Sequence, residues 1–195
     1  AYESIESPFM AGSLMISDSK DFLNTYPIQG GENIEMEVKS TFADKPYVYK
    51  FVIFSIGTRI VKNKTQLYIL ELISPEALIN EGTRVQDPLT GNPEAIIKKM
   101  LGKEYLDSKK DFFSEPSRFE VRLNPARTRP FDVISSLLRK CVSPKTTYVG
   151  KKYKTYEKNR QNNTNSNSKP VKGSAGFFFW ETRRGYNLLC ADSLC

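Results

Sequence analysis

A series of β-prone segments constrains the fold of this chain more than any other feature. Three of them follow one another at residues 33–39, 47–61 and 66–74, and polar and apolar side chains alternate strictly in the first. In the first segment Ile34 and Met36 fall on one face and Glu35 and Glu37 on the other, as in a sheet with one wet side. With another β-prone segment at residues 10–18, the pattern predicts an antiparallel meander of at least four strands, typical of a small barrel or sandwich.

A single glycine interrupts the longest of these segments. Gly57 stands within residues 47–61, where it predicts a bend or a β-bulge. Asn63-Lys64 then predicts a polar turn into the strand at residues 66–74. Residues 18–23 predict a short turn or helical piece after the strand at residues 10–18.

Helical patterns replace the alternation after residue 74. Ser74 precedes Pro75, which suits the first position of a helix, and Asn92 precedes Pro93 in the same way. The helix after Asn92 places its apolar residues on one side, and its lysines lie outside. A third helix is predicted over residues 131–141, with a single apolar stripe formed by Phe131, Ile134, Leu137, Leu138 and Cys141.

The last part of the sequence predicts a β-hairpin. Bulky residues favoured in strands run from Phe177 to Trp180, a turn follows at residues 183–186, and a second apolar segment continues to Ala191. Alternation within the aromatic segment predicts that Phe177 and Phe179 fill the core while Phe178 and Trp180 cover a second layer. Core packing therefore explains this segment better than an exposed docking patch does.

These segments predict an α+β protein in two parts. Residues 1–74 form an antiparallel β domain, a barrel or sandwich, and residues 75–195 form a smaller mixed domain of helices plus the hairpin. Residues 145–172 separate the third helix from the hairpin, and their low-complexity polar composition predicts a loop without a core of its own.

The positive charge of the chain is concentrated in one segment. Residues 139–172 contain ten Lys and Arg residues and one acid, a balance of +9, so the remainder of the chain sums to −2 against a total of +7. We consider three roles for the loop: a solvated segment, a contact with an acidic neighbouring subunit, or a nucleic-acid contact, since it interleaves cations with Tyr153 and Tyr156. The residues expected to contact a partner are Lys151, Lys152, Lys154, Lys158 and Arg160.

Residue usage gives little support for catalysis. The chain contains no His, which removes the commonest general base and metal ligand. Asp18, Glu32, Glu35 and Glu37 are candidates for a pair of glycosidase carboxylates, but alternation assigns Glu35 and Glu37 to a wet face. No glycine-rich phosphate loop is present. We therefore expect a non-enzymatic protein with no catalytic residue, no cofactor and no metal.

The three cysteines predict buried free thiols. Cys141, Cys190 and Cys195 lack metal-ligand spacing and give an odd count, which favours a reducing compartment such as the cytoplasm. No apolar segment is long enough to cross a bilayer, so no membrane association is expected. The pattern of the hairpin stops abruptly at Cys195, and we expect the sequence to be part of a longer chain.

The order of these segments resembles one known family, the baseplate hub proteins of contractile-tailed bacteriophages. The resemblance covers nearly the whole chain, and it depends on the order and spacing of several pieces rather than on one motif. The matching pieces are Gly12–Ser19 with Gly31–Met36, the helix Pro93–Leu101, and Phe131–Leu138 followed by the Phe-Phe-Trp-Glu sequence of the hairpin.

The resemblance implies a structural role. Members of the family have a tail-tube-like β domain followed by a mixed domain, and three chains form a ring that joins the sixfold tail tube to the threefold central spike. The implied partners are two further copies, tube or tube-initiator proteins, and the spike protein, with the genome passing through the lumen without specific binding. The implied location is the baseplate of the virion, after assembly in the host cytoplasm. A nucleic-acid-binding module that uses Lys145 to Lys172 is the alternative.

Overall fold

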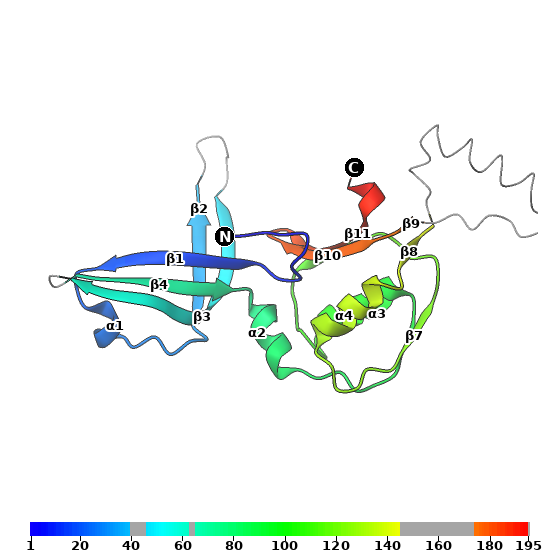
Figure 1. Ribbon diagram of the computed structural model, residues 1–195, viewed down its shortest axis with the longest axis horizontal. Helices are drawn as coiled ribbons and strands as arrows, with labels where there is room; N and C mark the ends of the chain where they lie inside the picture. The colour runs from blue at the N-terminus through cyan, green and yellow to red at the C-terminus, as the bar shows by residue number, and fades with distance from the viewer. Residues whose placement is uncertain (40–45, 63–64, 145–173, 195) are drawn as a thin grey trace, which may run out of the picture.

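The structure, a computed structural model, describes residues 1–39, 46–62, 65–144 and 174–194 (Figure 1). It is an α+β protein with mostly antiparallel strands and few helices, which confirms the predicted class. One four-stranded sheet occupies one end of the molecule, and a layer of helices with a β-hairpin occupies the other (Figure 1).

The N-terminal sheet is antiparallel throughout and curls into a half-barrel. Its order is β1-β4-β3-β2, so the last three strands in sequence form a meander, while β1 lies on the far side of β4. Because β1 and β2 lie at opposite edges, the sheet is open among the described residues. The strands are β1 (Ala11–Asp18), β2 (Asn33–Val38), β3 (Tyr47–Lys62) and β4 (Thr65–Ile73).

The concave face of this sheet carries the first hydrophobic core. Alternation along β4 turns Tyr68, Leu70 and Leu72 inward, and Phe51 and Ile53 of β3 meet them in the core. The short helix α1 (Phe22–Thr25) adds Leu23. The core residues of β3 and β4 are fully buried, whereas Leu14 and Ile16 of β1 and Ile34 and Met36 of β2 are half-buried against them. Hydrophobic burial on this face holds the curl together.

Two irregularities bend β3. The register against β4 shifts between Ile53 and Ser55 and again between Gly57 and Arg59. The second shift confirms the irregularity predicted at Gly57. The first was not predicted, because Phe54 continues the apolar alternation in the sequence; in the structure its side chain is exposed. Bulges of this kind increase local twist and curvature.

In the residues that the structure describes, the second part contains three α-helices, a short 3₁₀ helix (Ala191–Ser193) and several short strands. The three predicted helices are present as α2 (Pro75–Gly82), α3 (Pro93–Leu101) and α4 (Pro130–Leu138). The sequence pattern did not predict the strands before the hairpin, since two to four residues cannot show a period. They are β5 (Leu89–Gly91), β6 (Asp111–Ser114), β7 (Val121–Leu123), β8 (Val142–Ser143) and β9 (Ser174–Ala175).

Helix α4 is shorter than the sequence predicted. It ends at Leu138, and the backbone N–H of Lys140 donates to the carbonyl of Leu137 in a tight turn. This turn directs the chain toward β8, where Val142 pairs with Ala175. Cys141 is buried, as its place on the apolar stripe predicted, but it lies after the helix.

The predicted hairpin is formed by β10 (Phe177–Thr182) and β11 (Gly185–Cys190). Phe179 stacks on Tyr186 with ring centroids 5.3 Å apart, and Phe131 of α4 contacts both rings. Phe177 and Phe179 belong to the second hydrophobic core, as predicted, while Phe178 is half-buried. This aromatic contact fixes the hairpin against α4.

A third strand joins the hairpin by parallel pairing. Strand β6 lies beside β11, with Asp111 opposite Gly185. Gly185 has a φ of 149°, and a Cβ at this position would lie 2.3 Å from the Asp111 carbonyl oxygen. Only glycine permits this close approach, because it has no Cβ.

Candidate assembly site

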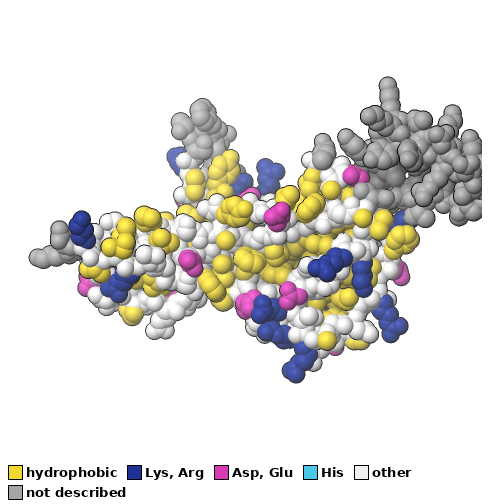
Figure 2. All heavy atoms as spheres, in the orientation of Figure 1, with side chains coloured by type: hydrophobic (Ala, Val, Ile, Leu, Met, Phe, Trp, Pro, Cys, Tyr) yellow, Lys and Arg dark blue, Asp and Glu magenta, His cyan; other side chains and the backbone are white. Residues whose placement is uncertain are grey.

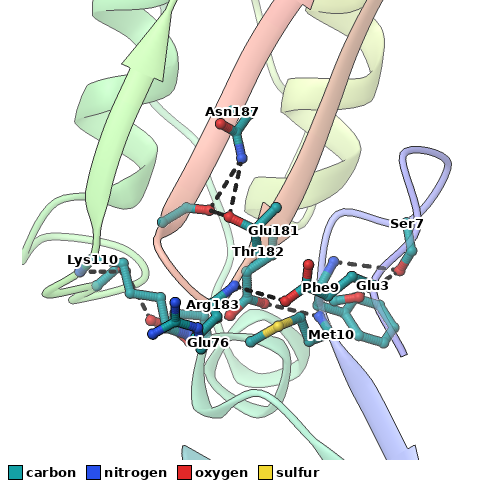
Figure 3. A network of polar contacts seen from close by, with 12 residues as sticks. Glu3, Ser7, Phe9, Met10, Glu76, Lys110, Glu181, Thr182, Arg183 and Asn187 are labelled. Atoms are coloured by element: carbon teal, nitrogen blue, oxygen red, sulfur yellow. Dashed lines mark hydrogen bonds and ion pairs between the residues drawn. The ribbon is translucent and has the colours of Figure 1, made fainter. Parts of the chain in front are cut away.

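A buried ionic group, here called the ionic junction, connects the two ends of the molecule. It consists of Glu76 at the start of α2, Lys110 before β6, and Glu181 on β10 (Figure 3). The Lys110 Nζ lies 2.6 Å from Glu76 Oε2 and also pairs with Glu181 Oε1. The Ser108 hydroxyl donates to the second oxygen of Glu76 at 2.7 Å. Three segments distant in sequence therefore meet at one ammonium group.

The N-terminal strand is attached to the same group. Glu181 Oε2 accepts a hydrogen bond from the backbone N–H of Met10, immediately before β1, at 2.9 Å. Both oxygens of this carboxylate therefore have partners, one in each part of the fold. Buried carboxylates are tolerated when paired and hydrogen-bonded in this way.

Burial shifts the ionisation of Glu181 within the junction. The Glu181 side chain is fully buried, and this desolvation raises its pKa above the ordinary 4.5, although Lys110 opposes the shift. The Tyr186 hydroxyl is close to Glu181, and burial, together with that negative charge, strongly raises the pKa of Tyr186. Ser74 also contributes a hydroxyl beside the Glu181 carboxylate. The arrangement is a structural ion pair in a low-dielectric setting.

The edges of the four-stranded sheet offer a second kind of contact. β1 pairs with β4 on one side, and on the other side the described residues provide only the bridge between Tyr2 and Ala11. Strand β2 pairs only with β3 among the described strands. Strand β1 from Gly12 onward therefore has an edge at which its backbone groups can pair with a further strand. The same holds for β2 along its whole length. Open edges of this kind are sites of β-strand addition.

The convex face of the sheet is partly apolar. The residues that point away from the core include Met15 of β1 and Ile60 of β3, both exposed, and the half-buried Leu67 and Ile69 of β4 lie between them. Yellow side chains over this end of the molecule are visible in the space-filling view (Figure 2). Contiguous apolar surface on a sheet favours contact with another protein.

The structure separates the carboxylates considered from the sequence. Glu35 and Glu37 are exposed on the wet face of β2, as predicted, and Glu35 lies 3.8 Å from Lys50. Asp18 differs, because it is buried, and its Oδ1 accepts a hydrogen bond from the backbone N–H of Lys20 at 2.8 Å. Glu32 accepts backbone hydrogen bonds within its own turn, which lower its pKa. These contacts hold local turns.

The partner-contacting residues expected from the sequence lie outside the described residues. They are Lys151, Lys152, Lys154, Lys158 and Arg160. The ionic junction, by contrast, was not found by sequence reasoning. Its members stand 34 and 71 residues apart, and no local pattern signals that one lysine pairs with both acids.

Cys141 and Cys190 are buried free thiols, as the sequence predicted, and Cys195 lies outside the described residues. Burial raises the pKa of Cys141 to about 11. Within the described part of the chain, no three His, Cys, Asp or Glu side chains converge in a way that could hold a metal ion. None of the helices described is long and apolar enough to span a membrane.

The chain was compared with known proteins. No protein-family model matches it, and the search of curated proteins returned no match either.

Proposed function

We propose that the protein is a structural baseplate hub subunit of a phage tail, and that three copies form a ring between the sixfold tail tube and the threefold spike. The observation that carries the proposal is the curled four-stranded sheet with both of its edge strands open among the described residues. A curved sheet with two free edges is suited to head-to-tail association, in which one edge pairs with the opposite edge of the next copy.

Strand directions support this geometry. Neighbouring strands alternate in direction along the order β1-β4-β3-β2, so β1 and β2 run in opposite directions. If successive copies share one orientation around a ring, β2 of one copy meets β1 of the next in antiparallel pairing. The same curl that encloses the first core then continues from copy to copy, and the sheet becomes tail-tube-like.

The apolar convex face and the ionic junction fit the same role. Met15 and Ile60 provide surface that a tube or spike protein could cover. The junction fastens the sheet to the mixed part, so that a force on one part is transmitted to the other. Neither feature requires catalysis, and the proposed protein is not an enzyme and uses no cofactor.

The oligomeric state in solution tests the proposal. Sedimentation velocity at micromolar concentration should detect a trimer, and negatively stained particles should be rings. Replacing two exposed residues of β1 with lysines, Ser13→Lys and Ser17→Lys, should weaken the ring, because charges on an edge strand oppose further pairing. Ser136→Lys on the exposed side of α4 is the matched control and should leave assembly unchanged. A wild-type protein that is a monomer throughout this range would contradict the proposal.

A nucleic-acid-binding module remains the second candidate, and the concentration of charge in residues 139–172 is the observation that favours it. Deletion of residues 145–172 distinguishes the two functions. A nucleic-acid-binding module should lose its salt-dependent affinity for nucleic acid after the deletion. A hub subunit should still form its ring.

A further inference from the structure

A cavity lies beside the ionic junction, where the sheet meets the mixed part of the molecule. Its volume is about 460 Å³, and it is lined by β3, the first turns of α2, the loop before β6 and the hairpin turn. Met10, Val48 and Leu106 supply apolar lining. Lys109, Lys110 and Arg183 supply positive charge, so the cavity combines an apolar part with a cationic one.

The charge of the lining is unequal. Four cations line the cavity, Lys50, Lys109, Lys110 and Arg183, against two acids, Glu76 and Asp107, which leaves a balance of +2. Lys110 is already engaged by the two carboxylates of the junction, and Lys50 has Glu35 at 3.8 Å. Within the described ranges, neither Lys109 nor Arg183 has an ion-pair partner. These two side chains are the cations available to a ligand.

Arg183 is held in position for such a ligand. Its guanidinium lies 4.5 Å from the centroid of the Tyr47 ring, a cation–π contact that restricts the side chain. The nearby Glu3 carboxylate accepts a hydrogen bond from the Arg183 backbone N–H at 3.0 Å, and among the described residues the guanidinium donors have no hydrogen-bond acceptor. Figure 3 shows Arg183 beside Glu76 and Lys110 of the junction. A planar guanidinium held in this way suits bidentate binding of a carboxylate.

The surface around the cavity extends the apolar part beyond what a small acid could cover. Tyr47, whose ring contacts Arg183, is 38% exposed, and Ile79, which lines the cavity, is 39% exposed. A free small carboxylate would occupy only part of the cavity and leave these side chains in water. A peptide segment with an acid next to aliphatic residues would cover both the cations and the exposed apolar groups.

We propose that this cavity binds an acidic peptide segment of a partner protein. In the bound state an Asp or Glu carboxylate pairs with Arg183 and Lys109, and a neighbouring aliphatic side chain enters the apolar part beside Met10 and Leu106. The proposal is carried by the cavity and its charge, and it does not require that the protein forms a ring. The positive charge of Arg183 and Lys109 favours a carboxylate, and the exposed apolar side chains of Tyr47 and Ile79 favour a peptide over a small acid.

Nuclear magnetic resonance titration of the full chain tests the proposal. The probe is the peptide acetyl-Leu-Glu-Leu-Asp-Leu-amide, and its matched control carries Gln and Asn in place of the two acids. The acidic peptide should cause saturable shifts of the amide signals of Arg183, Lys110 and Ile79. The control peptide should bind at least fivefold more weakly. Equal binding of both peptides, or shifts that do not saturate, would overturn the proposal.

Variants locate the carboxylate. Arg183→Gln and, independently, Lys109→Gln should each weaken binding of the acidic peptide at least threefold. Arg184→Gln is the control, because Arg184 is the next residue of the turn, is exposed and does not line the cavity. Equal affinity in the Arg183→Gln and Arg184→Gln variants would reject the assigned site. Tighter binding of octanoate than of the peptide would also reject it, since a small carboxylate would then be the better occupant.

Discussion

The carboxylate of Glu181 accepts a hydrogen bond from the backbone N–H of Met10 at 2.9 Å, across 171 residues of sequence. The contact joins β10 of the hairpin to the residue that precedes β1, so these two strands depend on one another. The opposite oxygen of the same carboxylate pairs with Lys110, which in turn pairs with Glu76. One acidic side chain therefore connects the sheet, α2 and the hairpin (Figure 3).

Replacing this carboxylate should destabilise the whole protein. Glu181→Gln preserves the shape of the side chain but removes the charge. The amide has only one oxygen, so its NH₂ group must face either Lys110 or the Met10 N–H, and both of these are donors. We expect the free energy of unfolding to fall by about 2 kcal/mol, because the amide of Gln cannot accept hydrogen bonds from both Lys110 and the Met10 N–H, so that one buried hydrogen bond is lost. Urea denaturation followed by circular dichroism measures the change.

Glu37→Gln is the matched control for this substitution, because Glu37 is exposed on β2 and the described contacts include none of its carboxylate. Its effect should stay within about 0.5 kcal/mol, the usual range for surface substitutions. Equal stabilities of the two variants would show that the ionic junction contributes nothing specific to folding.

The pH dependence of the Glu181→Gln effect follows from the raised pKa of Glu181. Burial makes the Glu181 carboxyl group hold its proton more tightly in the folded protein than in the unfolded chain, where its pKa is near 4.5. Stability from this group is therefore complete below pH 4.5 and is lost as the pH rises through the folded pKa. The difference in unfolding free energy between wild type and Glu181→Gln should widen as the pH is lowered from 7 toward 4.5. Narrowing over this range would mean that the attraction of Lys110 outweighs burial.

The N-terminal sheet could be predicted from the sequence because each of its strands is long enough to show a period. Segments of six to sixteen residues can display inward and outward faces, and the burial of β4 alternates in this way, whereas Phe51, Val52 and Ile53 of β3 are buried in succession. The position of β1 next to β4 could not be predicted in the same way. Local alternation determines which face is buried, but it contains no information about which edge a strand joins.

The mixed part contains tertiary contacts that no local sequence pattern could predict. Asn80 is buried on α2, and its side-chain oxygen accepts a hydrogen bond from the backbone N–H of Phe131 at the start of α4, at 2.9 Å. In the sequence Asn80 is one polar residue near a helix end. The ionic junction could not be predicted for the same reason. Lys110 and Glu181 come close together only because β6 and β10 lie in one sheet with β11.

The buried thiol of Cys141 predicts a loss of stability at alkaline pH. Its pKa is raised to about 11 by burial, against 9.0 for the unperturbed group. Between these values the unfolded chain releases the proton and the folded protein retains it, so stability falls as the pH rises through 9. Relative to Cys141→Ala, the wild type should lose up to about 3 kcal/mol by pH 11. Unfolding midpoints of both proteins at pH 8, 9, 10 and 11 measure the effect, and a constant difference would contradict it.

The approach of β6 to β11 predicts a severe effect of adding one methyl group. In Gly185→Ala the new Cβ would lie 2.3 Å from the carbonyl oxygen of Asp111, and the backbone φ of 149° is unfavourable for alanine. The parallel pairing would have to open, and we expect a loss of about 3 kcal/mol in unfolding free energy. Gly82→Ala, at the last position of α2, meets nothing within 4 Å and should be neutral or stabilising by about 0.5 kcal/mol. Thermal unfolding of both variants separates these outcomes, and similar midpoints would mean that β6 does not pair with β11 in solution.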